Sequence, residues 1–222
     1  MKKKLLLILA AWALTALAAP AQALNPEDQQ LLSEGPACVR VMPDLAQWSI
    51  DFSYTSPAAP NEPLRPKHVV ITKAAALRHV ERVYESGLKG DLWRTGYMEV
   101  ESRSNQPRLL TRVVAGDGVA DFPELEWVSA KNFVGVRTEG DRKCLVFQEE
   151  RFTEFHGSLG MAVALVDAEK RLPVGYRFLN EIRRYTILPA PPAKLTMPAE
   201  FAAAGKAMLD HIEKTTPHLS AP

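Results

Sequence analysis

Apolar and polar side chains alternate along much of this chain, which is the pattern of half-buried β-strands. The alternation is clearest from Trp48 to Tyr54, where every second residue is aromatic or aliphatic and the residues between are Ser or Asp. A period of two places the apolar residues on one face of a strand. This segment therefore predicts an antiparallel strand with one buried and one solvated face.

Further strand candidates follow, separated by Gly, Ser, Asn and Pro turn signals. They lie at residues 67–73, 91–102, 108–116, 144–152, 160–167, 172–180 and 182–189, with one more ending near Val136. Residues 76–86 fit either a helix or a strand, because their apolar residues lie three apart. Gly87 and Gly90 nearby favour a hairpin.

Few segments favour a helix. Residues 25–35 begin with an Asn-Pro pair and reach Gly35, just past the expected end, which predicts a short helix. Residues 122–127 predict a turn or short helix. Residues 198–214 predict a longer helix whose apolar face is expected to cover an open sheet, with Phe201, Ala204, Met208 and Ile212 on that face. Four prolines between residues 55 and 66 predict an exposed loop.

The first residues have the order of a secretory signal peptide. Lys2, Lys3 and Lys4 precede an apolar run that ends at Ala21-Gln22-Ala23. Pro20 and this small-residue site keep the run below the length of roughly 20 residues that spans a bilayer. We therefore expect residues 1–23 to be a signal peptide cleaved after Ala23, and residues 24–222 to form a single periplasmic domain with no stable membrane span.

The charge balance argues against a nucleic-acid partner. Removing the three early lysines from 27 basic residues leaves 24 against 26 acidic ones, a net charge of −2. A nucleic-acid surface needs a basic patch or stripe, and the sequence contains no basic cluster.

Cys38 and Cys144 are the two cysteines of the chain. An even number of cysteines in an exported protein favours a disulfide, and a bridge across so long a loop would stabilise the fold by roughly 4–5 kcal/mol. The alternative is two buried thiols that do not meet.

No motif in the sequence predicts catalysis, a metal or a cofactor. The five histidines lack the spacing of a helical metal pair, and Ser158, although it lies between Gly157 and Gly160, lacks the G-x-S-x-G spacing of a nucleophile elbow. No glycine-rich phosphate loop occurs. Glu149, Glu150 and Glu154 could act as acid or base, but an exposed strand end explains them better. We therefore expect a protein that is not an enzyme.

Large apolar side chains on strands are the remaining candidates for a site. One curved sheet with helices on one face can leave an apolar cavity. Aromatic residues would give such a cavity a large contact area. The candidates to line it are Trp48, Phe52, Trp93, Tyr97, Trp127 and Phe178, and ordinary core packing is the alternative for each of them.

The C-terminal third resembles the superfamily of the periplasmic lipoprotein carrier LolA and its outer-membrane receptor LolB. The resemblance rests on Asp167 in a turn, on Leu172-Pro173 before the strand 174–178, and on the strand 185–188 with the proline-rich run and Pro198–Phe201 that follow it. It implies an α+β fold, in which a curved antiparallel sheet forms an incomplete barrel and helices cover its concave face.

The resemblance also implies a function outside catalysis. Members of this superfamily hold acyl chains of lipoproteins or other lipids in the half-barrel cavity. We therefore expect this protein to bind a lipid, a lipoprotein acyl chain or another apolar ligand, with no cofactor and with an envelope protein as a further partner. A ligand-free interaction module of an envelope complex and, third, an envelope hydrolase remain alternatives.

Overall fold

The computed structural model describes residues 38–59, 64–114, 120–153, 157–191 and 194–215. The expected signal peptide and the expected helix at residues 25–35 lie outside the described residues. The strands are β1 Leu45–Tyr54, β2 Pro66–Ala74, β3 Leu77–Tyr84, β4 Lys89–Thr95, β5 Met98–Arg103, β6 Gln106–Val113, β7 Phe133–Glu139, β8 Arg142–Thr153, β9 Gly157–Asp167, β10 Pro173–Phe178 and β11 Glu181–Leu188. Two short 3₁₀ helices, η1 Pro123–Leu125 and η2 Ala130–Asn132, precede β7, and α2 Ala199–Thr215 follows the last strand.

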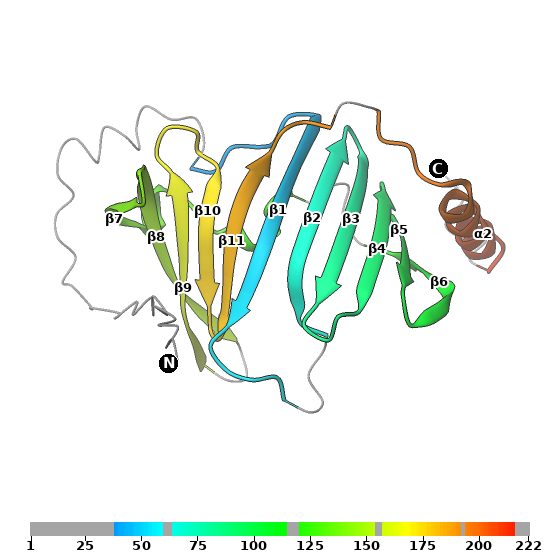
Figure 1. Ribbon diagram of the computed structural model, residues 1–222, viewed down its shortest axis with the longest axis horizontal. Coiled ribbons are helices and arrows are strands. Elements are labelled where there is room, and N and C mark those ends of the chain that lie inside the picture. The colour runs from blue at the N-terminus through cyan, green and yellow to red at the C-terminus, as the bar shows by residue number, and fades with distance from the viewer. Residues whose placement is uncertain (1–37, 60–63, 115–119, 154–156, 192–193, 216–222) are drawn as a thin grey trace, which may run out of the picture.

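All eleven strands form one antiparallel sheet, with the order β6-β5-β4-β3-β2-β1-β11-β10-β9-β8-β7. Figure 1 shows the strands as one curved layer with α2 at the end near β5 and β6. The first strand pairs with the last, Trp48 opposite Ile187, and thereby joins two consecutive meanders. The edge strands β6 and β7 do not pair with each other, so the sheet is open. The expected α+β class with a curved, incomplete barrel is confirmed.

Local turn chemistry explains most strand boundaries. The segment at residues 91–102, predicted as one strand, is in fact the hairpin β4–β5, because Gly96 has a φ of 52° and turns the chain. Gly140, with a φ of 62°, makes the equally tight turn between β7 and β8. The ambiguous residues 76–86 contain strand β3, as the neighbouring glycines favoured.

The main core lies on the face of the sheet that carries Trp48, here called the Trp48 face. Trp48, Leu145, Phe147 and Val166 are all 0 % exposed. Residues 120–132, here called the cover segment, cross this face and contain η1 and η2. Phe122 from the cover segment packs 5.6 Å from Trp48 and edge-on at 5.9 Å from Tyr185, measured between ring centroids.

A second core lies on the opposite face, here called the Trp93 face. Trp93, Met98 and Val100 pack there against Phe201 of α2. The Trp93 and Phe201 ring centroids are 6.3 Å apart, and a Cβ on Gly205 would meet Met98 at 3.3 Å. Of the residues expected on the sheet-facing side of α2, Phe201, Ala204 and Met208 belong to this second core.

The position of α2 differs from the expectation that helices would cover the concave face alone. Arg78 on β3 binds the cover segment, and Arg94 stands directly opposite it on β4, so both point to the same face. Trp93, the neighbour of Arg94 in the sequence, contacts α2. Adjacent residues of a strand point to opposite faces, so α2 and the cover segment lie on opposite sides of the sheet. The reason is local: Trp93, Met98 and Val100 are apolar on the face that elsewhere carries Ser49 and Asp51.

Both cysteines are free thiols, so the predicted disulfide is not present in the structure. Cys144 is fully buried on β8 and points its sulfur at the Arg142 carbonyl oxygen, 3.9 Å away. Cys38 is half-buried against the main core. Burial raises the pKa of both thiols.

Candidate functional site

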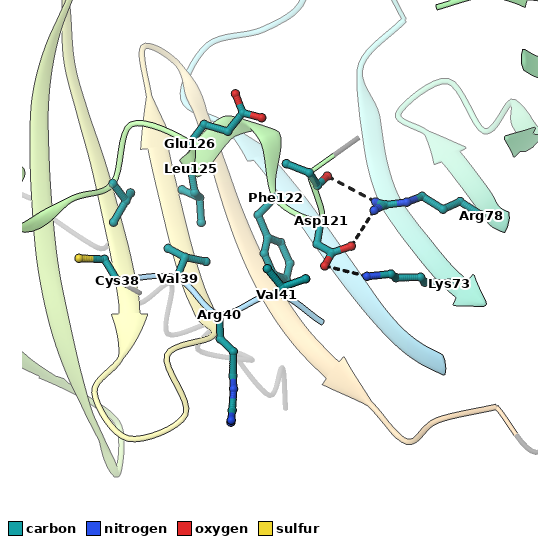
Figure 2. Close-up of a pocket in the computed structure, with 12 residues that line it drawn as sticks. Cys38, Val39, Arg40, Val41, Lys73, Arg78, Asp121, Phe122, Leu125 and Glu126 are labelled. Carbon is teal, nitrogen blue, oxygen red and sulfur yellow. Dashed lines mark hydrogen bonds and ion pairs between the residues drawn. The ribbon is translucent and has the colours of Figure 1, made fainter. Parts of the chain in front are cut away.

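A buried carboxylate fixes the cover segment to the sheet. Asp121 accepts hydrogen bonds from Lys73 Nζ at 3.1 Å, from an Arg78 guanidinium nitrogen at 2.7 Å and from the Met42 backbone N–H at 2.8 Å. Figure 2 shows Asp121 between the two cations, with Arg78 also reaching the Ala120 carbonyl oxygen. Three donors offset the cost of burying this charge, so the segment has one well-defined position.

Two hollows lie on either side of this ion pair, and Arg78, Ala120 and Asp121 line both. The first, the Cys38 pocket, measures about 420 Å³ and lies between residues 38–41 and the cover segment (Figure 2). The second, here called the Val80 cavity, measures about 430 Å³ and lies between the cover segment and strands β1–β5. Small-molecule sites typically measure roughly 300–1,000 Å³, so the Val80 cavity has the size of a ligand site.

The floor of the Val80 cavity is apolar because of strand register. Ile71, Val80 and Leu92 stand directly opposite one another on β2, β3 and β4, next to Trp48 on β1. The next row adds Ile50 and Val69. The cavity is therefore continuous with the main core at one side. Further apolar lining residues are Phe52, Leu64, Pro66 and Tyr84 from the sheet and the loop before β2, and Ala120 and Pro123 from the cover segment.

A row of charged residues borders this floor. One charged residue from each strand, β2 to β6, stands opposite the next, and together they are here called the charged row: Lys73, Arg78, Arg94, Glu99 and Arg112. Like charges directly opposite each other are destabilising. Here Glu99 lies 3.2 Å from Arg94 and also pairs with Arg112, while Asp121 pairs with Arg78 and Lys73. The row is thus an ion-pair network half-buried on the Trp48 face.

A second charged group closes the cavity at β11. Glu124 of the cover segment lies 3.2 Å from Arg183 and accepts a hydrogen bond from the Tyr185 hydroxyl. Burial disfavours the charged form of Arg183, but Glu124 and Glu181 outweigh it and raise the Arg183 pKa. Burial and the neighbouring Glu124 charge raise the pKa of Tyr185 as well.

The charged residues that line the Val80 cavity balance. Four arginines, at positions 78, 82, 94 and 183, face four carboxylates, at positions 99, 121, 124 and 181. These charges are paired across the rim rather than directed at one point. The cavity therefore favours an uncharged or weakly polar occupant over an ion.

The structure brings one of the six aromatic candidates into this cavity. Phe52 lines it, beneath the Arg183 guanidinium, which stands 5.2 Å from the ring centroid. Trp48 is completely buried beneath Phe122. Trp127 and Phe178 pack half-buried against the main core.

The other two candidates lie away from the cavity. Trp93 lies on the opposite face, stacked on His79 at 4.2 Å and covered by Phe201. Tyr97 is 51 % exposed in the turn after β4.

Apart from Phe52, the residues that form the site were not among the sequence candidates. The floor consists of aliphatic residues, Ile71, Val80 and Leu92, and such residues are so common in strands that their identity carries no signal. Arg78 and Arg94 could have drawn attention, because they interrupt the apolar face of two strands. The remaining key residue, Asp121, lies in a turn whose partners are visible only after the strands pair.

The described residues contain no cluster of side chains that could hold a metal ion. No group of three metal-ligating side chains occurs among them. The two imidazoles with a carboxylate partner, His68 with Asp51 and His79 with Asp91, lie on the Trp93 face. In the same part of the chain, no helix has both the length and the apolar character that crossing a bilayer requires.

Neither a family model nor a curated protein matches this sequence. Among solved structures, the chain is similar to a LolA superfamily protein from Nitrosomonas europaea. The two are 9 % identical over 78 % of this chain and 95 % of that one, with a TM-score of 0.27. Likeness at this level assigns no function. Fold and site together define an open antiparallel sheet with an apolar cavity beneath a fixed cover segment.

Proposed function

We propose that this protein binds an apolar molecule, such as a lipid or the acyl chain of a lipoprotein, in the Val80 cavity. The observation that carries the proposal is the apolar floor, in which Ile71 and Val80 stay half-buried although Leu92 and Trp48 beside them are closed off at 2 % and 0 % exposed. Apolar surface left in a hollow is the usual mark of a ligand site. The binding takes place outside the cytoplasm, after export directed by residues 1–23.

The affinity would come from burial rather than from a fixed polar contact. Each methylene moved from water into the cavity contributes about 0.8 kcal/mol. Because the rim charges balance, they exclude a bare ion without demanding a particular headgroup. We therefore expect selectivity for chain length and shape more than for headgroup.

The proposal is tested by extracting the purified protein with organic solvent and analysing the extract by mass spectrometry. The wild type should release an apolar molecule in stoichiometric amount. Val80→Arg should release much less, because a guanidinium would fill the cavity floor. A clean wild-type extract would contradict the proposal, as would equal amounts from the wild type and Val80→Arg.

Val70→Arg is the matched control for this experiment. Val70 is also half-buried on β2, but it stands opposite Ser49 and Glu81 on the Trp93 face. The same substitution there should keep the ligand. Both variants must retain the circular dichroism and the melting transition of the wild type for the comparison to hold.

A second candidate function is binding to an envelope protein through the open sheet edges. Leu110 and Val113 on β6 are 42 % and 48 % exposed, and Val134 on β7 is 49 % exposed. Unpaired edge strands with apolar side chains can pair with another chain. This candidate predicts a protein that co-purifies with the wild type and is lost when Leu110 or Val134 is changed to Lys, while the extracted ligand is unchanged.

A further inference from the structure

Beyond the Val80 cavity, the Trp48 face of the sheet continues over β3–β6 to the open edge. Two carboxylates of β5, Glu99 and Glu101, lie on this part of the face with side chains that are 10 % and 4 % exposed. Each carboxylate is shared by two arginines. The two carboxylates and their partners are here called the arginine face: Glu99 with Arg94 and Arg112, and Glu101 with Arg82 and Arg103.

Strand register holds Glu101 between its two arginines. Arg103 donates two hydrogen bonds of 3.0 Å to the Glu101 carboxylate, and an Arg82 guanidinium nitrogen lies 3.5 Å from it. Gly90 stands between Arg82 and Arg103 in one cross-strand row, and a Cβ there would meet Glu101 Oε1 at 3.5 Å. Burial alone would raise the pKa of Glu101, but the hydrogen bonds from Arg103 and the charges of the neighbouring arginines lower it. The carboxylate is therefore ionised and counts in the charge balance.

The arginine face carries a net positive charge. Four guanidiniums stand against two carboxylates, and the other two carboxylates of strands β3–β6, Glu81 and Asp91, point to the Trp93 face. The balance inside the Val80 cavity does not extend this far, because Arg103 and Arg112 lie outside its lining. The rest of residues 24–222 has 20 basic against 24 acidic residues. The arginine face is thus a positive patch on a chain that is otherwise negative.

The outer part of the arginine face is accessible to a large partner. The side chain of Arg112 is 55 % exposed, and those of Arg82 and Arg103 are 27 % exposed. Strand β6 is the last strand of the sheet on this side, and α2 packs on the opposite face. No strand of the sheet therefore stands between the arginine face and a surface that approaches the β6 edge.

An exposed apolar residue connects the arginine face to the Val80 cavity. Leu110 on β6 stands directly opposite Glu101, and the same cross-strand row continues through Leu92 to Val80. The guanidiniums lie on both sides of this row. A partner at the β6 edge would contact apolar and basic side chains together, next to the proposed ligand cavity.

We propose that the arginine face docks this protein on the surface of a bilayer that carries anionic phospholipids. Guanidiniums bind phosphate oxygens with charge-assisted hydrogen bonds, and an anionic leaflet attracts basic residues close to it. Because the rest of the chain is negative, the attraction orients this face toward the bilayer. The choice of a bilayer over an acidic protein rests on the proposed function, since a lipid ligand is received or delivered at a membrane.

Co-sedimentation with vesicles tests the proposal. The wild type should bind vesicles of phosphatidylglycerol and phosphatidylcholine in equal amounts, and high salt should release it. Vesicles of phosphatidylcholine alone should not bind it. The double variant Arg103→Gln/Arg112→Gln should bind the anionic vesicles about tenfold more weakly or worse, because two basic residues near the bilayer are lost. Each glutamate keeps one arginine in this variant, so its melting transition should stay close to that of the wild type.

Lys89→Gln/Lys206→Gln is the matched control. It removes the same charge from exposed residues on the Trp93 side of the sheet, and it should bind the vesicles as the wild type does. Arg103→Lys/Arg112→Lys should also bind, because the attraction depends on the charge. Absence of wild-type binding to the anionic vesicles, or equal losses in the two glutamine double variants, would overturn the proposal.

Two comparisons separate this proposal from the others. Val80→Arg should lose the extracted ligand and still bind vesicles, so a clean wild-type extract would contradict the cavity function, whereas loss of vesicle binding would contradict the docking surface. An acidic protein that co-purifies with the wild type but not with Arg103→Gln/Arg112→Gln, in the absence of vesicle binding, would overturn the choice of a bilayer.

Discussion

The two halves of the sheet bury opposite faces. From β7 to β11 and in β1, the buried face of the sheet carries Trp48, Phe147 and Tyr185 and is covered by the cover segment. From β4 to β6, the buried face carries Trp93, Met98 and Val100 and is covered by α2. The charged row occupies the Trp48 face where the core has moved to the other side. The Val80 cavity lies at this transition, so the change of face itself leaves an apolar floor without a full cover.

This comparison shows how a single sheet can place charge and apolar surface side by side. Which face of a strand is buried depends on which segment packs against it. Phe122 and Leu125 of the cover segment bury the Trp48 face in one half of the sheet. Phe201 and Gly205 of α2 bury the Trp93 face in the other half.

The largest effect is expected from Trp48→Ala. Removing a completely buried indole from the main core should lower the free energy of unfolding by about 4–5 kcal/mol. Trp93→Ala should cost less, about 3 kcal/mol, because α2 can move into the space left by the ring. Urea unfolding of both variants measures the difference. Equal losses would mean that the two halves are one core.

Asp121→Ala should have the next largest effect. It would remove the carboxylate that neutralises Lys73 and Arg78 and release the cover segment, at a cost of about 3–4 kcal/mol. Hydrogen exchange should rise in residues 120–132 before it rises in α2. Asp141→Ala, an exposed acid in the β7–β8 turn, is the control and should be neutral. Equal protection of the cover segment in Asp121→Ala and the wild type would refute its anchoring role.

Gly205→Leu should separate α2 from the sheet while sparing the main core. Its side chain would have to enter the space held by Met98 and Val100, which costs about 1–3 kcal/mol. Ala203→Leu adds the same side chain on the exposed side of the helix and should have little effect. The fluorescence of Trp93 should change in Gly205→Leu, with Trp48 unaffected. A change in the main core would contradict the division of the sheet.

The smallest effect concerns alkaline pH. Burial and the charges of Glu181 and Glu85 raise the pKa of Tyr54 to about 12, above the unfolded value of about 10. Folding therefore favours the neutral phenol, and this contribution is complete below pH ~10 and is lost as the pH rises to about 12.

Tyr54→Phe isolates this contribution. The variant loses the hydrogen bond to the Pro66 carbonyl oxygen at every pH, yet its stability should fall less steeply between pH ~10 and ~12 than that of the wild type. Urea unfolding at a series of pH values measures the slope. Identical slopes for Tyr54→Phe and the wild type would show that Tyr54 does not contribute.

Much of this architecture could be predicted from the sequence, and the exceptions have physical reasons. The period-two pattern of β1 predicts its strand and its buried face, and the spacing of Phe201, Ala204 and Met208 predicts a sheet-covering helix. The pattern could not tell that Trp93 belongs to the other face, because alternation defines which residues share a side but not which side is covered. For the same reason the sequence could not distinguish Phe52, which lines the Val80 cavity, from Trp93, which packs against α2 on the other face.

The site itself was mostly hidden from the sequence. Its floor depends on register, which brings Ile71, Val80 and Leu92 into one row from three strands. Asp121 reaches Lys73 and Arg78 across 48 and 43 residues of chain. Such pairings follow from the tertiary fold and have no local motif.

The most direct test of the Val80 cavity as a ligand site is a methyl NMR titration of the whole protein with 1-decanol, an uncharged single-chain probe. The account predicts the largest shift changes at the methyl groups of Ile50, Val69, Ile71, Val80 and Leu92, saturating together, with Val163, Leu165 and the α2 interface unchanged. Shift changes confined to Val163 and Leu165 or to α2, or no saturable change at all, would contradict it.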